Sequence, residues 1–144
     1  MKSSSQFGAA LAIAWLVACS AGCAPGPQFG KIAGKLTIPG HTAEDIRIEF
    51  HPDAAAGTQG PSSVGETDAE GNFTLACALD SGVKEGAIVG KHRVVLQDLR
   101  LSKSETGRGI VQRFSPLHSA VLTTPLVIEV KPGEQSLTLQ PQAR

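Results

Sequence analysis

Apolar and polar residues alternate with a period of two over much of the chain after residue 30. In the clearest run, Ile46, Ile48 and Phe50 alternate with charged or polar neighbours. Successive side chains of a β-strand point to opposite faces, so this pattern predicts strands with one buried face. The same spacing recurs in five further segments: Ile32, Leu36 and Ile38; Phe73, Leu75 and Cys77; Val94 and Leu96; Leu126, Ile128 and Val130; Leu137 and Leu139.

Turn-forming residues separate these segments, and together they indicate the fold class. They are Pro39-Gly40, Pro52-Asp53, Asp68-Ala69-Glu70-Gly71 and Lys131-Pro132-Gly133-Glu134. Many short strands joined by Gly- and Pro-rich turns predict an all-β domain, here a single seven-strand-type antiparallel β-sandwich over residues 31–144.

Two connections, residues 54–63 and 99–124, are too long to be tight turns. Loops of this length in a compact domain are usually functional or mobile. The first contains mostly small residues. The second contains the candidate contacts with a partner, which are Lys103, Arg108, Arg113 and Phe114.

The first residues of the chain have the features of an export signal. Lys2 precedes an uninterrupted apolar run at residues 7–18, which is shorter than the roughly 20 residues of a membrane-spanning helix. The run ends in a sequence that resembles the bacterial lipobox, in which cleavage precedes a Cys whose thiol carries a diacylglycerol: Leu16-Val17-Ala18-Cys19. Cys19 is therefore the predicted lipidation site, with Cys23 as the alternative.

Three parts follow from this reading: a lipoprotein signal peptide at residues 1–18, a flexible tether at 19–30 and the domain. The tether is rich in Gly, Pro and small residues. In lipoproteins that the signal resembles, a residue other than Asp after the lipidated Cys favours the outer over the inner membrane, and here that residue is Ser20. The expected location is the bacterial cell envelope, with the domain facing the periplasm or the exterior.

Composition narrows the possible partners. Of 144 residues, 13 are basic and 13 acidic, and no basic cluster suggests binding to nucleic acid. There is no Tyr, and Trp15 lies in the predicted signal, so sugar binding on exposed aromatic platforms is not expected. The 126 residues after the signal suffice for one domain with a core.

One segment resembles the hairpin signature of carboxypeptidase regulatory-like domains, which have a transthyretin-like (prealbumin-like) β-sandwich fold: Thr67-Asp68-Ala69-Glu70-Gly71-Asn72-Phe73-Thr74-Leu75. Residues 30–37, 86–94, 113–114 and 124–133 resemble other segments of that family, in the same order. The last two resemble the closing segment of small bacterial envelope lipoproteins built on this module. The resemblance covers residues 30 to 140 approximately.

Turn chemistry alone explains the signature. The Asp68 carboxylate can accept backbone N–H groups, and Gly71 supplies the positive φ of a bulged hairpin. A calcium loop built from Asp68, Glu70 and Asn72 is the rival interpretation, but a hairpin offers too few oxygen ligands.

Recognisable catalytic or metal-binding motifs are not found in the sequence. Residues 86–92 are one residue short of a phosphate-binding loop, and residues 60–65 lack the spacing of a nucleophile elbow, so serine-nucleophile chemistry has no support. The four histidines are scattered and expected to be mostly solvated: His41, His51, His92 and His118. No metal or other cofactor is expected.

The predicted function is therefore a non-catalytic lipoprotein, a protein-interaction or structural module held at the membrane by its N-terminal lipid and contacting another envelope protein. One alternative is a lipoprotein that binds a small molecule or carbohydrate in a cleft lined by Phe114 and the arginines of the long connection. A less favoured one is an enzyme with a loop-built metal site involving His51, His92 or His118. Cys77 is expected to be a buried small hydrophobe, against the alternative of a disulfide with Cys23.

Overall fold

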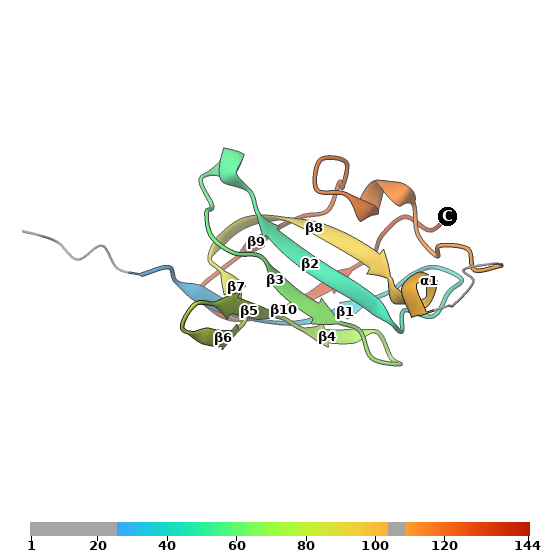
Figure 1. The fold of residues 1–144 in the computed structure, drawn as a ribbon, viewed down its shortest axis with the longest axis horizontal. Coiled ribbons are helices and arrows are strands. Elements are labelled where there is room, and N and C mark those ends of the chain that lie inside the picture. The colour runs from blue at the N-terminus through green and yellow to red at the C-terminus, as the bar shows by residue number, and fades with distance from the viewer. Residues whose placement is uncertain (1–25, 104–108) are drawn as a thin grey trace, which may run out of the picture.

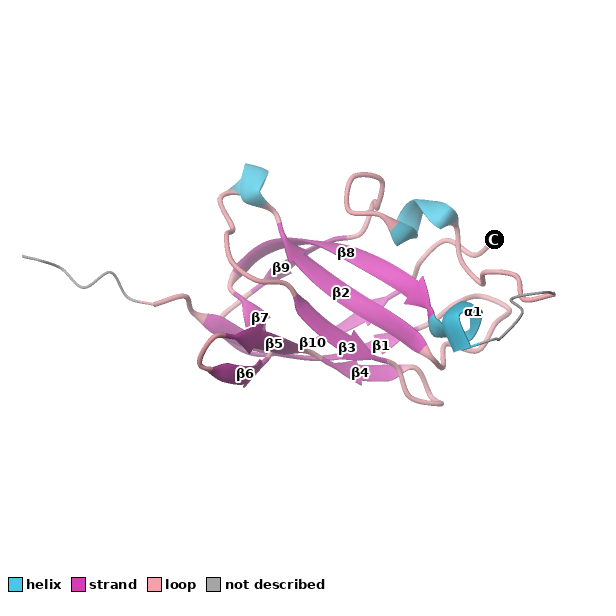
Figure 2. Cartoon of the chain, in the orientation of Figure 1, coloured by secondary structure: helices cyan, strands magenta, loops and turns pink. Residues whose placement is uncertain are grey.

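A computed structural model describes residues 26–103 and 109–144 of the chain, which form two β-sheets packed face to face (Figures 1 and 2). The elements are β1 (Phe29–Leu36), β2 (Ile46–Pro52), η1 (Ala54–Ala56), β3 (Ser63–Glu66), β4 (Asn72–Thr74), β5 (Ala76–Leu79), β6 (Gly82–Glu85), β7 (Ala87–Ile88), β8 (Gly90–Asp98), α1 (Leu99–Lys103), η2 (Pro116–Ser119), β9 (Val127–Val130) and β10 (Gly133–Leu139). The prediction of an all-β sandwich is confirmed. No helix within the described residues has the length and apolar character needed to cross a membrane.

The smaller sheet has the order β10-β1-β4, and β7 pairs with the beginning of β1. Strand β1 begins at Phe29, two residues before the predicted start of the domain. The expectation of a purely antiparallel, seven-strand sandwich is wrong in two respects. The structure describes ten strands, and β1 and β10 run parallel, paired from Gly30↔Gly133 to Leu36↔Leu139. The two strands can be parallel because β10 follows β9 across the sandwich instead of forming a hairpin with it.

The larger sheet has the order β6-β5-β3-β2-β8-β9, with β2 and β8 at its centre. These two strands pair antiparallel from Ile46↔Asp98 to Pro52↔His92. As the alternation predicted, Ile46, Ile48 and Phe50 of β2 are fully buried. The two sheets share one apolar core, whose other members include Ile32, Leu36, Phe73, Leu75, Val94, Leu96, Phe114, Val130 and Leu139.

The run of alternating residues at 72–79 is divided between the two sheets. Strand β4 pairs with β1 in the smaller sheet, and β5 pairs with β3 and β6 in the larger one. Leu75, between the two strands, is buried, so the alternation of inward side chains continues through the crossing. The chain therefore passes from one layer to the other here without a loop.

The two ends of the sandwich differ. Strand β1 begins at one end, close to β6 and β7, whereas α1, η2 and the C-terminus lie at the other (Figure 1). Residues 26–28, which precede β1, thus lie at the end opposite α1 and η2.

Candidate functional site

The structure places the predicted site residues in very different surroundings. Cys19 and Cys23 lie outside the described residues, as does Arg108. Lys103 is the last residue of α1, and its side chain is not among those described. The remaining four are Asp68, Gly71, Arg113 and Phe114.

Asp68 and Gly71 form the predicted turn. The Asp68 carboxylate accepts the backbone N–H groups of Glu70 (3.0 Å) and Asn72 (2.7 Å). Gly71 has φ +82° and donates its N–H to the Asp68 carbonyl at 3.0 Å. The hydrogen bond from the Asn72 backbone is the largest cause of the lowered pKa of Asp68. All these contacts are local, so the turn residues alone explain the geometry.

The same turn is not a hairpin, because the strands on either side of it belong to different sheets. Strand β3 precedes it in the larger sheet, and β4 follows it in the smaller one. The turn is fastened to β1 by the N–H of Leu36, which donates to the Gly71 carbonyl at 2.8 Å. On the other side, the buried Thr67 hydroxyl accepts the N–H of Ile46 at 2.9 Å. The signature residues therefore form a connection between layers.

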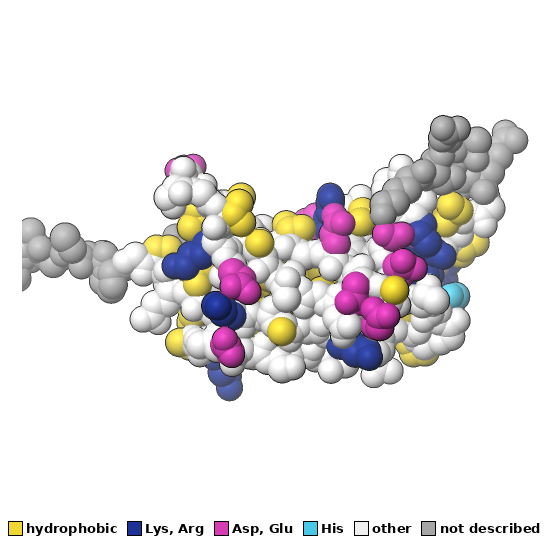
Figure 3. All heavy atoms as spheres, turned by 90° about the horizontal axis from the view of Figure 1, so that it is seen from below, with side chains coloured by type: hydrophobic (Ala, Val, Ile, Leu, Met, Phe, Trp, Pro, Cys, Tyr) yellow, Lys and Arg dark blue, Asp and Glu magenta, His cyan; other side chains and the backbone are white. Residues whose placement is uncertain are grey.

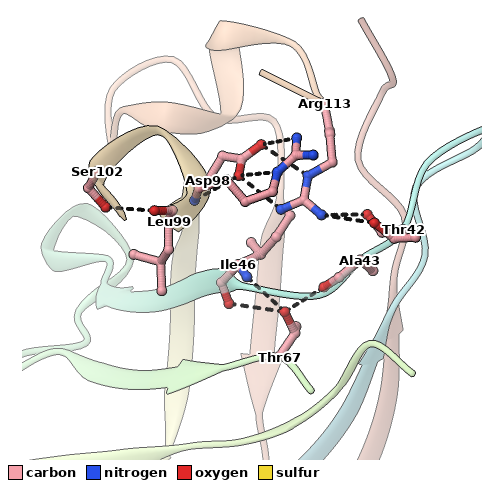
Figure 4. A network of polar contacts seen from close by, with 9 residues as sticks. Thr42, Ala43, Ile46, Thr67, Asp98, Leu99, Ser102 and Arg113 are labelled. Atoms are coloured by element: carbon pink, nitrogen blue, oxygen red, sulfur yellow. Dashed lines mark hydrogen bonds and ion pairs between the residues drawn. The ribbon is translucent and has the colours of Figure 1, made fainter. Parts of the chain in front are cut away.

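The expectation that Arg113 and Phe114 are presented to a partner is wrong. Only 2% of Arg113 is exposed, and Phe114 belongs to the apolar core. The guanidinium of Arg113 donates to both carboxylate oxygens of Asp98, through Nε at 3.0 Å and Nη2 at 2.9 Å. Its Nη1 donates to the Thr42 carbonyl at 2.7 Å (Figure 4). Arg113 is buried because its charge is paired and its donors are satisfied.

Asp98 also binds a second arginine. Arg100 Nε and Nη2 donate to the Asp98 carboxylate at 3.1 and 3.0 Å, and more than a third of the Arg100 side chain is exposed. Burial of Asp98 opposes its ionisation, but the hydrogen bonds from Arg100 and Arg113 outweigh burial and lower its pKa to about 2. The charged cluster links the end of β8 to the 99–124 connection and to the segment before β2.

A hollow of about 550 Å³ lies beside this cluster, on the outer face of the larger sheet. Strands β2 and β8 supply its floor, and α1 and the segment around η2 supply its walls. We call it the outer hollow, and its lining residues are Glu49, Val95, Leu96, Gln97, Asp98, Leu101, Ser102, Gln112 and Ser119. A cleft lined by Phe114 and the arginines of the connection is thus not what the fold builds, since Phe114 and Arg113 point inward and polar uncharged residues take their place.

Three side chains next to this hollow form a hydrogen-bonded row that sequence reasoning missed. His51 Nε2 lies 3.0 Å from a Glu49 carboxylate oxygen, and His51 Nδ1 lies 2.9 Å from the Ser62 hydroxyl oxygen. Glu49 and His51 share the outer face of β2, and Ser62 comes immediately before β3, which pairs with β2. The spacing of two on one strand was a usable signal, but the position of Ser62 follows only from the register.

Enzymes that use a serine nucleophile have the same set of groups: a carboxylate, an imidazole and a hydroxyl in a hydrogen-bonded row. Catalysis of that kind also needs N–H donors that hold the developing oxyanion. In the structure the row joins the outer face of β2 to the residue that precedes β3.

The expectation that the histidines are mostly solvated is wrong for His92 and His118, of which 0% and 2% are exposed. Burial lowers the pKa of both imidazoles. His118 Nε2 accepts the backbone N–H of Gln142 at 3.1 Å, and its ring packs edge-on against Phe114. Within the described residues, no three His, Cys, Asp or Glu side chains gather as a metal site.

Cys77 is fully buried, as the prediction of a small core hydrophobe requires. Its Sγ lies 3.6 Å from the carbonyl of Ser62. The alternative link to Cys23 concerns a residue outside the described part of the chain.

Large apolar side chains are exposed on the 99–124 connection. The exposed fractions are 91% for Leu122, 64% for Val111 and 51% for Leu117, and Leu101 is also exposed. The Thr123 hydroxyl donates to the Leu117 carbonyl at 2.8 Å, so the turn that contains Leu122 is held against η2. This apolar set lies on the elements that wall the outer hollow.

No protein-family model, curated protein or solved structure matches the chain.

Proposed function

We propose that the chain is a non-catalytic envelope lipoprotein, anchored by a lipid at Cys19, whose β-sandwich binds another envelope protein through the 99–124 connection. The sandwich is of the transthyretin-like, carboxypeptidase regulatory-like type. Support for that type comes from the two-sheet architecture and from the resemblance of residues 67–75 to the family signature.

The observation that carries the proposal is the exposure of Val111, Leu117 and Leu122 on one connection. Single exposed apolar residues are ordinary, whereas exposed apolar side chains that gather into a patch are typical of interaction sites, and we propose that these three form part of one. Hydrogen bonds hold the connection in place at Arg113 and His118, so these side chains stand on an ordered support. Binding then requires little ordering of the free protein.

The position of the connection agrees with this role. Its elements α1 and η2 lie towards the end of the sandwich opposite the start of β1 (Figure 1). A lipid tether before β1 would hold the near end towards the membrane and leave these elements available to a partner.

A photo-crosslinking residue at Leu122 tests the interface in the anchored full-length protein. The matched control is Val83 on β6, which is 79% exposed at the tether end of the sandwich. We expect a discrete crosslinked protein from position 122 and none from position 83. Equal products from both positions would contradict the proposed interface.

The anchor is tested separately by fatty-acid labelling. Cys19→Ala should abolish labelling and release the protein from the membrane fraction, whereas Cys23→Ala should change neither. Labelling that persists in Cys19→Ala and disappears in Cys23→Ala would move the anchor to Cys23.

A further inference from the structure

We infer that the outer hollow binds an extended peptide segment of the partner, with an aliphatic side chain seated on Val95 and Leu101. This inference rests on the proposed function and specifies the chemistry of the partner. The hollow is large enough for such a ligand, since pockets of about 300 to 1,000 Å³ hold small ligands or peptide side chains.

The polar groups that line the outer hollow are mostly uncharged. They are the amides of Gln97 and Gln112 and the hydroxyls of Ser102 and Ser119. Gln112 Nε2 donates to Ser119 Oγ at 2.7 Å, and Ser102 Oγ donates to the Leu99 carbonyl at 2.9 Å. The Ser119 hydroxyl proton, the Gln112 amide oxygen and the Ser102 lone pairs remain available. The Gln97 amide makes no side-chain hydrogen bond among the described residues.

Amides and hydroxyls both donate and accept, as the backbone of an extended peptide does. Peptides recognised in this form gain affinity from main-chain hydrogen bonds and specificity from alternate side chains. Val95 on the floor and Leu101 on the wall give such a peptide an apolar contact beside its hydrogen-bonding groups.

The carboxylates of the lining argue against a cationic ligand. Asp98 is neutralised by Arg100 and Arg113, and Glu49 is hydrogen bonded to His51. A ligand cation would have to compete with these arginines and with His51 for the two carboxylates. No aromatic side chain is among the described residues that line the hollow, so they offer a sugar ring no stacking platform.

The test uses the full chain in detergent micelles as bait for a displayed library of random heptapeptides. We expect the enriched peptides to share an aliphatic residue. Leu101→Asp and Gln97→Arg should each weaken binding of the enriched peptides about tenfold or more, as expected when a charge is placed in a binding contact.

Two matched substitutions control for added charge. Val83→Asp on β6 and Ser136→Arg on β10 place the same charges on exposed positions away from the hollow, and peptide affinity should stay within about twofold of the parent. Circular dichroism melting of all four variants identifies any that fail to fold.

The inference is overturned if no peptide is enriched, if the enriched peptides bind Leu101→Asp and Gln97→Arg as well as the parent, or if they require a charged residue and no aliphatic one. The proposed function fails differently, by loss of the crosslink specific to position 122. A surviving crosslink with no peptide binding would reject the hollow and keep the interface.

Discussion

The turn at residues 68–71 and the connection at residues 99–124 both carry residues with a predicted role, and they are held in place by different kinds of contact. In the turn, Asp68 bonds to residues two and four positions away. In the connection, Arg113 bonds to Asp98, 15 positions away, and to Thr42, 71 positions away. Local sequence therefore determines the turn, whereas the rest of the fold determines the connection.

Within the connection, long-range contacts also decide which side chains are buried and which are exposed. Arg113, one of the residues predicted to contact a partner, is buried, because its guanidinium pairs with the carboxylate of Asp98 at the end of β8. Apolar residues of the same connection, such as Leu117 and Leu122, are exposed to solvent instead. The described part of a long polar connection can thus be fastened to the rest of the fold, and its contact residues can be the apolar ones.

The largest effect is expected from removing the long-range ion pair between Asp98 and Arg113. Asp98→Ala should lower the free energy of unfolding by about 3 to 5 kcal/mol, because it leaves the buried Arg113 guanidinium without its counter-charge. The control is Glu66→Ala, which removes the exposed pair with Arg47 and should cost less than about 1 kcal/mol. Urea denaturation of both variants gives the comparison, and equal losses would contradict the role of the buried pair.

The turn at residues 68–71 should be destabilised by backbone strain at Gly71. Gly71→Ala should cost about 1 to 3 kcal/mol, because it combines a positive φ with a clash of the new Cβ against the Leu36 carbonyl. Gly57 also has a positive φ, +85°, but open space at its Cβ position, so Gly57→Ala should cost only about 1 kcal/mol. Thermal melting compares the two variants. If Gly71→Ala is as stable as Gly57→Ala, the clash with the Leu36 carbonyl makes no measurable contribution.

As pH falls, the free energy of unfolding should decrease first through His92 and His118 and only later through Asp98 and Asp68. The folded pKa values of His92 and His118 lie below 6.5, so the unfolded chain takes up protons first. Their contribution is complete above pH 6.5 and is lost as pH falls below it, by up to about 1.4 kcal/mol per pH unit for each histidine. The stabilisation from Asp98 and Asp68 is lost only as pH falls below 3.8.

Denaturation series between pH 7.5 and 5 measure this effect. His118→Gln and His92→Gln should each remove about half of the slope, since each deletes one buried imidazole. A parent protein whose stability is flat over this interval would show that the two histidines take up protons in the folded state.

The features that the sequence predicted are those set by neighbouring residues, and the features that it did not predict depend on long-range contacts. Alternation predicted the buried faces of β2 and β8 and the inward position of Leu75, because periodicity depends only on neighbours in the sequence. The parallel pairing of β1 and β10 and the split of β4 and β5 between sheets depend on which strands meet. Arg113 and His118 were expected at the surface because such residues usually are, and only the positions of Asp98 and Gln142 explain their burial.

The central claim is that the exposed apolar residues of the 99–124 connection bind a partner, and its most direct test is quantitative proximity labelling of the anchored protein with the double substitution Leu117→Ser and Leu122→Ser. Exposed positions contribute little to stability, so the melting temperature should stay within a few degrees of the parent. We expect most labelled neighbours to be lost in this variant and retained in Val83→Ser. An unchanged set of neighbours in a folded, anchored double variant would contradict the account.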